Sequence, residues 1–151
     1  DVVNFPVSKI QLSNLKGKVI VLDFWATWCG SWIKKLPMVD SVQRKFKDRI
    51  QVILVNSITG TGDTKEKVLS FFNKKIAPNG KSFTVPIALE DTLLRQLFPH
   101  TYLPHYVWID ANGKVIGITS SEGFTNENIL ASLNGCILTR GSIEVQTPKQ
   151  E

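Results

Sequence analysis

The stretch WATWCGSW, residues 25–32, contains the side chain with the clearest chemical potential in the chain, the thiol of Cys29. This cysteine follows an apolar run typical of a buried strand and precedes apolar residues at helical spacing. Only a thiolate is a good nucleophile, and the unpaired N–H groups at a helix N-terminus stabilise that anion. Gly30 allows a tight turn beside the sulfur. The sequence therefore predicts an exposed, activated thiol, with a buried and inert cysteine as the alternative.

No second sulfur follows at the spacing that dithiol chemistry uses. Trp32 stands three residues after Cys29, and the other cysteine, Cys136, lies far along the chain. In dithiol exchange one sulfur attacks a disulfide, and the second sulfur releases the mixed disulfide that results. Because position 32 has no sulfur, the second step lacks a local nucleophile, and the sequence argues against ordinary two-cysteine oxidoreduction.

Three other ionisable side chains are candidates for chemistry. Asp23 lies within the apolar run, where burial raises the pKa of a carboxyl group, and it is either a structural acid with a partner or a functional one. His105 follows Pro104, but strand alternation turns it away from the face that Pro104 presents. His100 is expected in a loop. The spacing of the two histidines and two cysteines does not fit zinc ligands, so no metal site is predicted.

The elements that must position Cys29 alternate between strands and helices. We predict an edge strand in IQLSNL and buried strands over 19–26 and 50–58, and a helix from about residue 31 that Pro37 should kink. Further elements are a helix over 64–76 capped by Asp63 with Glu66, an extended segment over 83–90, a short helix from Asp91 to Leu97, a hairpin of 105–110 and 114–120 around Asn112-Gly113, and a last helix over 126–134 capped by Thr125. This order predicts an α/β fold with parallel early strands.

Length and composition indicate one domain, which we place at residues 1–136, followed by a tail or linker over 137–151. The net charge of +5 is spread along the chain without a basic cluster or a recognised motif, so no nucleic-acid binding is predicted. No apolar run approaches the roughly 20 residues of a membrane span. The chain begins at Asp1 without an initiator Met, and we interpret it as a processed piece.

FWATWCG, Pro37, the X-Pro before a strand and the Asn-Gly hairpin together resemble the thioredoxin superfamily. The resemblance is nearest to the TlpA-like thiol-disulfide oxidoreductases common in Bacteroidetes, and it covers about residues 5–135. It implies a thioredoxin-like fold, with a central mixed β-sheet flanked by helices on both faces. It also implies an extracytoplasmic location and no bound cofactor, because the sulfur itself carries the electrons.

The same resemblance assigns expected roles to Cys29, Asp23, Trp28, Leu103 and Pro104, whereas Trp32 departs from it by replacing the family's resolving cysteine. Cys29 matches the nucleophile, and Asp23 matches the buried acid that assists proton transfer; Pro104 would form a cis peptide bond with Leu103. The substrate groove is expected to be lined by Trp28, Trp32, Leu103 and Pro104, and the backbone before Pro104 is expected to hold an extended segment as an added strand. The family's last helix packs on a sheet face away from the site, which argues against Cys136 as the resolving sulfur.

Three functions stay open. In the first, Cys29 is a single working thiol whose mixed disulfides are resolved by glutathione or a partner protein, so the partners are protein or low-molecular-weight thiols and disulfides. In the second, a redox-inactive scaffold binds peptide segments in the groove. In the third, Cys29 reduces peroxide as in one-cysteine peroxidases. In each case the domain is expected to be monomeric, either alone or within a longer chain.

Overall fold

The strands form one mixed sheet in the computed structural model, which describes residues 1–78, 82–89 and 92–138. The order across the sheet is β1-β4-β3-β2-β5-β6. The strands are β1 (Val2–Val3), β2 (Val19–Phe24), β3 (Ile50–Asn56), β4 (Ile87–Leu89), β5 (His105–Ile109) and β6 (Val115–Thr119). Strands β2, β3 and β4 run parallel, whereas β1, β5 and β6 each pair antiparallel with their neighbours.

The two central strands are buried along their whole length. Every residue of β2 and β3 is buried, as expected of near-continuous apolar runs covered on both faces. Alternation along β2 sends Val21 and Asp23 to one face of the sheet and Leu22 and Phe24 to the other. The carboxyl end of β2 leads directly into the WATWC loop, so this sheet edge positions Cys29.

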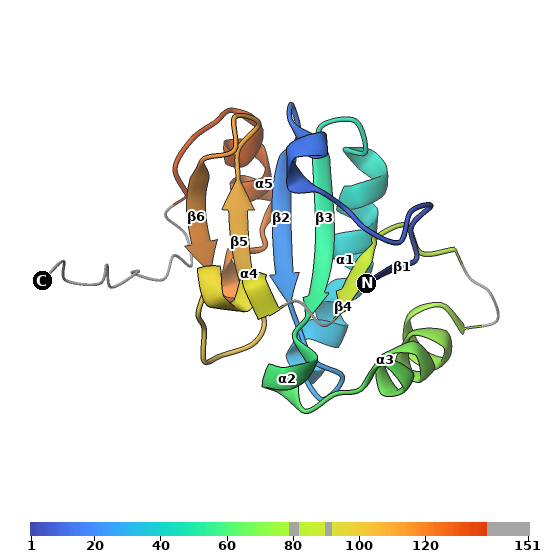
Figure 1. The fold of residues 1–151 in the computed structure, drawn as a ribbon. Helices are drawn as coiled ribbons and strands as arrows, with labels where there is room; N and C mark the ends of the chain where they lie inside the picture. Colours follow the sequence, from blue (N-terminus) through green and yellow to red (C-terminus); the bar gives the residue numbers. More distant parts are fainter. Residues whose placement is uncertain (79–81, 90–91, 139–151) are drawn as a thin grey trace, which may run out of the picture.

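Helices cover both faces of the sheet, as the sequence predicts (Figure 1). Apolar side chains of α1, α3 and α5 pack into the larger core cluster on one face, and those of η1 and α4 pack on the other face. The helical elements are η1 (Leu12–Leu15), α1 (Gly30–Lys45), α2 (Ile58–Thr61), α3 (Lys65–Phe71), the π-helix η2 (Phe72–Ile76), α4 (Thr92–Leu97), η4 (Ser121–Gly123) and α5 (Asn126–Leu133).

Two local signals are confirmed by atomic contacts. Strands β5 and β6 form the predicted hairpin, and Gly113 has φ of +87°, which glycine adopts without strain. The Asp110 carboxylate closes the turn by accepting from the backbone N–H groups of Asn112 and Lys114, both at 2.9 Å. The Thr125 side chain caps α5 by accepting from the N–H of Asn128 at 3.2 Å.

The predicted edge strand in IQLSNL is wrong, because Leu12–Leu15 form the 3-10 helix η1. Leu12 and Leu15 are three residues apart, so one turn of helix directs both side chains onto the smaller core cluster. Both edges of β2 are already paired, with β3 and β5, and leave no place there for another strand. The edge strand is instead β1, which pairs with β4.

The predicted cap at Asp63 is also wrong. Thr64 is the N-cap of α3, and its hydroxyl accepts from the N–H of Lys67 at 3.2 Å. The Asp63 carboxylate is directed to the WATWC loop instead. The predicted helix over 64–76 is divided in two: α3 ends at Phe71, and η2 begins at Phe72. The predicted cap at Asp91 lies outside the described residues.

The folded region extends beyond α5 along the free side of β6. Leu138 is 3% exposed, and its N–H donates to the carbonyl of Ile116 at 2.9 Å. The boundary at residue 136 stays a prediction, although Leu138 packs into the larger core cluster. No helix in the described ranges is long and apolar enough to cross a bilayer.

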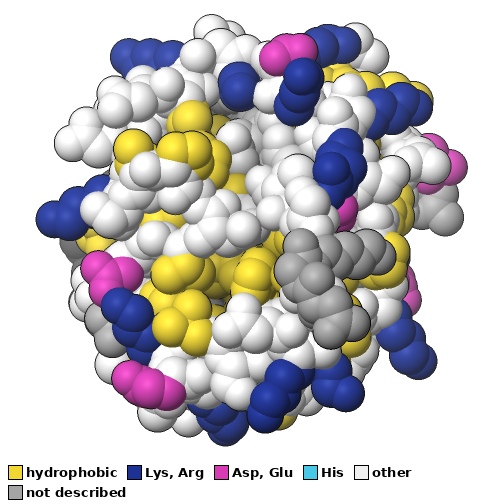
Figure 2. All heavy atoms as spheres, turned by 90° about the vertical axis from the view of Figure 1, so that its right-hand side faces the viewer, with side chains coloured by type: hydrophobic (Ala, Val, Ile, Leu, Met, Phe, Trp, Pro, Cys, Tyr) yellow, Lys and Arg dark blue, Asp and Glu magenta, His cyan; other side chains and the backbone are white. Residues whose placement is uncertain are grey.

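On the face that Figure 2 shows, lysine and arginine side chains are scattered around an apolar patch and do not gather in one place. This arrangement agrees with the dispersed positive charge inferred from the sequence.

Candidate redox site

Cys29 lies between the central strand and the longest helix. It is the N-cap residue of α1, and its N–H donates to the carbonyl of Ala26 at 3.1 Å. The Cys29 sulfur lies 3.5 Å from the hydroxyl oxygen of Ser31. The strand-turn-helix placement is as predicted, so the unpaired N–H groups of the first helical turn lie at the cysteine.

The predicted exposure of Cys29 is wrong, because only 6% of the residue is accessible. Cys29 belongs to the larger core cluster, together with Trp25, Trp32 and Tyr106. These three aromatic side chains are fully buried, and they fill the space between the sheet and the start of α1. Thiol activation stays a prediction.

Trp32 is fully buried and points into the sheet. Its indole N–H donates to both carboxyl oxygens of Asp23, each at 3.1 Å. Its ring stacks on Trp25, with ring centroids 4.2 Å apart and an angle of 15° between the planes. The prediction that Trp32 lines the substrate groove is therefore wrong: burial, stacking and the Asp23 contact hold the side chain away from the surface.

Asp23 has no solvent contact, and burial raises its pKa well above the ordinary value. The hydrogen bond from Trp32 opposes this shift but does not cancel it. The raised pKa was predicted from the position of Asp23 in a buried strand. The donor was not predicted: the residue that stands in place of a second sulfur is also the hydrogen-bond partner of the acid.

Trp28 is the exposed aromatic residue of the loop. Its side chain is 62% exposed, and its indole N–H donates to the carbonyl of Thr61 in α2 at 3.0 Å. The Leu103–Pro104 peptide bond is cis, Leu103 is half-buried and Pro104 is buried. A groove that joins Trp28 to Leu103 and Pro104 stays a prediction.

A buried acid that sequence reasoning did not connect to the site holds the loop before Cys29. Asp63 is 2% exposed and accepts from the N–H and the hydroxyl of Thr27, at 2.9 and 2.6 Å. It also accepts from the side-chain amide of Asn56 at 2.9 Å and lies 3.5 Å from the ammonium group of Lys67. Burial alone would raise the pKa of Asp63, but these donors hold it below the ordinary value.

The parallel pairing of β2 with β3 was the available signal for this contact. The carboxyl ends of adjacent parallel strands meet at one sheet edge, so the residues that follow β2 and β3 are neighbours. Thr27 follows β2, and Asp63 follows β3 through the short helix α2. Asp63 therefore acts as an anchor for the loop that carries Cys29.

The two histidines lie on the face of the sheet opposite Cys29. His105 is 5% exposed, and its ring stacks on His100, with centroids 4.7 Å apart. Both rings also contact Phe24. Burial, and then the charge of His100, lower the pKa of His105 to about 4. The orientation agrees with strand alternation, which turns His105 away from Cys29.

The remaining candidate residues are distant from this chemistry or structural. Cys136 is exposed after α5, and both Cys29 and Cys136 are free thiols. Trp108 and Phe124 belong to the core, and the Trp108 indole donates to the Thr119 hydroxyl at 3.0 Å. Within the described part of the chain, no three His, Cys, Asp or Glu residues are grouped as metal ligands would be.

Comparisons with known proteins agree with this fold. The family model described as Redoxin matches residues 4–131. The thiol-disulfide oxidoreductase ResA of Bacillus subtilis is 30% identical over 116 residues, which cover 74% of this chain and 58% of ResA. Three of the curated relatives, ResA included, are matched over 36% to 58% of their own length.

Solved structures of other proteins share this fold. A putative thiol:disulfide interchange protein DsbE from Chlorobium tepidum superposes with a TM-score of 0.67 and 27% identity, covering 82% of this chain and 86% of that one. An exposed lipoprotein thioredoxin from Streptococcus pneumoniae superposes with a TM-score of 0.65 and 27% identity, covering 82% and 89%.

Proposed function

Because the chain belongs to the Redoxin family, we propose that it is a thiol-disulfide exchange domain that works through one thiol, Cys29. One observation carries this proposal. Cys29 is the N-cap of α1, whereas the position of a second sulfur is filled by Trp32, which is buried and bonded to Asp23. The nucleophile of a redox site is retained, and its resolving partner is replaced.

The exchange needs an external thiol to complete a cycle. The Cys29 thiolate attacks the glutathionyl sulfur of a mixed disulfide; a sulfur–sulfur bond to Cys29 forms, the original one breaks, and the protein thiolate leaves with the electron pair. A glutathione thiolate then attacks the glutathionyl sulfur on Cys29, which yields glutathione disulfide and restores the Cys29 thiolate. One free glutathione thiol is thus oxidised for each protein thiol that is released, and the other half of the glutathione disulfide comes from the substrate.

The surroundings of Cys29 suggest how substrate would be held. Trp28 exposes an aromatic face beside the cysteine, and the Leu103–Pro104 segment precedes β5. We propose that a disulfide-bearing segment lies between Trp28 and this cis peptide, so that backbone pairing fixes its direction. The substrates are protein or low-molecular-weight disulfides. The proposed location is extracytoplasmic, which the exposed pneumococcal lipoprotein among the similar structures supports.

The two alternative functions have less support. The redox-inactive binding hypothesis uses Trp32 as one wall of a peptide groove, but this side chain is buried and contacts Asp23. No observation on the described residues favours the peroxidase hypothesis.

A glutathione-dependent assay on a glutathionylated peptide tests the proposal. We expect Cys29→Ser to reduce turnover to the rate of the uncatalysed reaction, because the attacking sulfur is removed. The matched control is Cys136→Ser, which removes the exposed thiol. Turnover should be retained within about twofold, since substitutions of surface residues away from the core and the site have small effects. Turnover that survives Cys29→Ser, or that depends on Cys136, would refute a mechanism through Cys29.

A further inference from the structure

The hydroxyl of Tyr106 is a buried polar group whose bonding in the resting structure is incomplete. The residue has no accessible surface, and its hydroxyl oxygen has no hydrogen-bond partner. A buried donor without a partner is costly, so such groups call for a specific explanation. The ring itself is well fixed, since it stacks on Phe124 with centroids 5.3 Å apart.

Sheet register places Tyr106 beside the redox site. Tyr106 in β5 is the direct partner of Asp23 in β2, so both side chains extend from the same face of the sheet. This is the face that α1 covers, and Tyr106, Trp32 and Cys29 belong to one core cluster there. The next pair along the strands, Phe24 with His105, points to the opposite face.

The pKa of Tyr106 depends on burial and on two neighbouring ionisable groups. Burial, then the charges of Asp23 on β2 and of Cys29 at the start of α1, raise the pKa of Tyr106 well above its usual value. The phenol therefore keeps its proton across the pH range in which thiols ionise, and it acts only as a donor towards an anion. Asp23 already receives the indole N–H of Trp32, whereas among the described residues the Cys29 sulfur has one side-chain hydrogen-bond contact, with the Ser31 hydroxyl.

We propose that the Tyr106 hydroxyl donates a hydrogen bond to the sulfur of Cys29 once that sulfur is a thiolate. The phenol keeps its proton, and no covalent bond forms or breaks in this step. This donor would add to the Ser31 hydroxyl and the first-turn N–H groups of α1 in compensating for the burial of a charged sulfur. This inference rests on the proposed function for its biological use, but the interaction itself does not require turnover.

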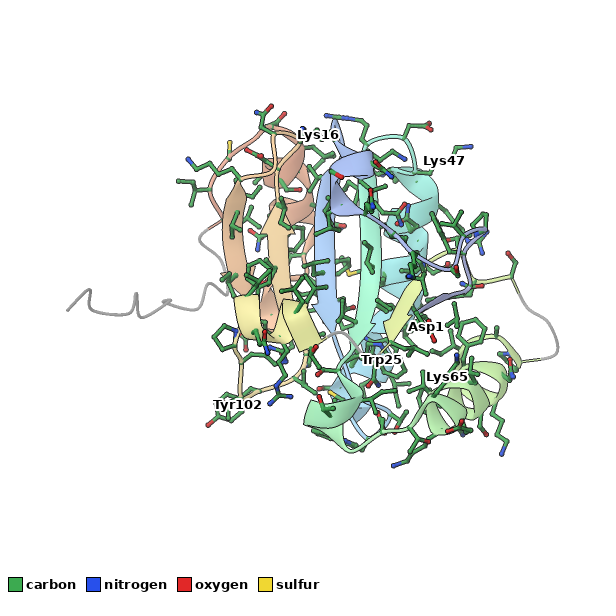
Figure 3. The ribbon with its side chains drawn as sticks, in the orientation of Figure 1. Asp1, Lys16, Trp25, Lys47, Lys65 and Tyr102 are labelled. Carbon is green, nitrogen blue, oxygen red and sulfur yellow. The ribbon has the colours of Figure 1, made fainter. Side chains whose placement is uncertain are left out.

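The test compares two tyrosine variants in a Cys136→Ser background, where Cys29 is the one remaining thiol. The rate of Cys29 alkylation by iodoacetamide is followed against pH. We expect Tyr106→Phe to move the midpoint of the rate profile upward by about one pH unit, equivalent to about 1.4 kcal/mol. The control is Tyr102→Phe, the same change at a side chain that is 84% exposed and points outward from the loop before β5 (Figure 3). Its midpoint should match that of the parent.

Equal midpoints for Tyr106→Phe and Tyr102→Phe would overturn the proposal. Circular dichroism checks that both variants fold, since a purely structural effect would change the melting temperature without moving the midpoint. If Tyr106→Phe does not fold, the ultraviolet spectrum of the Tyr102→Phe chain, in which Tyr106 is the one tyrosine, is recorded against pH. A tyrosine band that shifts with the alkylation midpoint, and not in Cys29→Ser, supports the proposal, and a band without that shift overturns it.

The outcome is separable from that of the proposed function. A parent chain without glutathione-dependent turnover, together with a midpoint shift in Tyr106→Phe, would refute the function and retain the interaction. Normal turnover with no shift would do the reverse.

Discussion

Two adjacent residue pairs between β2 and β5 place an acid and a base on opposite faces of the same sheet. The pair Asp23–Tyr106 faces α1 and Cys29, and the pair Phe24–His105 faces the other side. Burial acts on both, raising the pKa of Asp23 and lowering that of His105. Low dielectric favours the neutral form of either group, so the same physical cause moves an acid and a base in opposite directions.

The two faces differ in how the buried group is satisfied. Asp23 has an indole donor at both oxygens, supplied by a residue in the first turn of α1. The Nε2 atom of His105 has no partner, and its ring is held by stacking on His100. Ring stacking is present on both faces, and on the α1 face a directed hydrogen bond to the buried ionisable group is added to it. The ionisable group with hydrogen-bond partners is therefore the one on the face that carries Cys29.

The largest expected effect comes from removing the donor on the α1 face. We expect Trp32→Ala to lower the free energy of unfolding by about 3–5 kcal/mol, because it opens a cavity beside Trp25 and leaves Asp23 without its donor. Denaturant unfolding measures the change. The matched control is Trp28→Ala, at a side chain that is 62% exposed, with an expected loss below about 1 kcal/mol. Comparable losses for the two variants would mean that Trp32 does not organise this face.

The second prediction concerns acid sensitivity on the opposite face. The pKa of His105 falls from 6.5 to about 4 on folding, so the unfolded chain binds the proton more readily. Its contribution to stability is complete above about pH 6.5 and is lost as the pH falls towards 4, by about 3 kcal/mol at most.

Unfolding measured from pH 7 to pH 4 should therefore show a shallower decline for His105→Gln, which cannot take up this proton. His100→Gln is the comparison, because the pKa of His100 is lowered in the same direction by burial. A decline in His105→Gln as steep as that of the parent chain would contradict the assignment.

The smallest expected effect is at Asp23. Its contribution to the free energy of unfolding changes with pH in the direction opposite to that of His105. Its raised pKa means that the folded chain binds the proton more tightly than the unfolded chain. Stability from this group is complete below about pH 4 and falls as the pH rises through the folded-state value. Asp23→Asn keeps an acceptor for Trp32, so we expect a loss of about 1 kcal/mol at pH 5, and a flatter profile above it. An unchanged slope would show that Asp23 does not titrate as inferred.

Structural elements that depend on residues close together in the sequence were predictable. The apolar run of β2, the Asn112-Gly113 hairpin and the Thr125 cap each depend on a few neighbouring residues whose conformational preferences agree. The thioredoxin-like resemblance added the sheet arrangement, which the six-stranded order confirms.

Features that depend on contacts between distant residues were missed. Asp63 has the sequence signature of a helix cap, but Thr27 and Asn56 offer it three donors across the ends of β2 and β3. The position of Trp32 after Cys29 suggested a side chain that lines the substrate groove, whereas the buried carboxyl of Asp23 gives the indole N–H a partner inside the core. Tertiary partners, and not local preference, decide where such side chains point.

The seating of Leu138 against β6 has a consequence for self-association. Gly117 offers no Cβ, and one built there would meet the Leu138 side chain at 2.8 Å, so the close approach depends on glycine. With Leu138 bonded to Ile116, part of the outer rim of β6 is already occupied by the chain's own backbone. An exposed edge strand can pair with strands of other molecules, so covering part of the β6 edge makes edge-to-edge pairing of two copies less favourable.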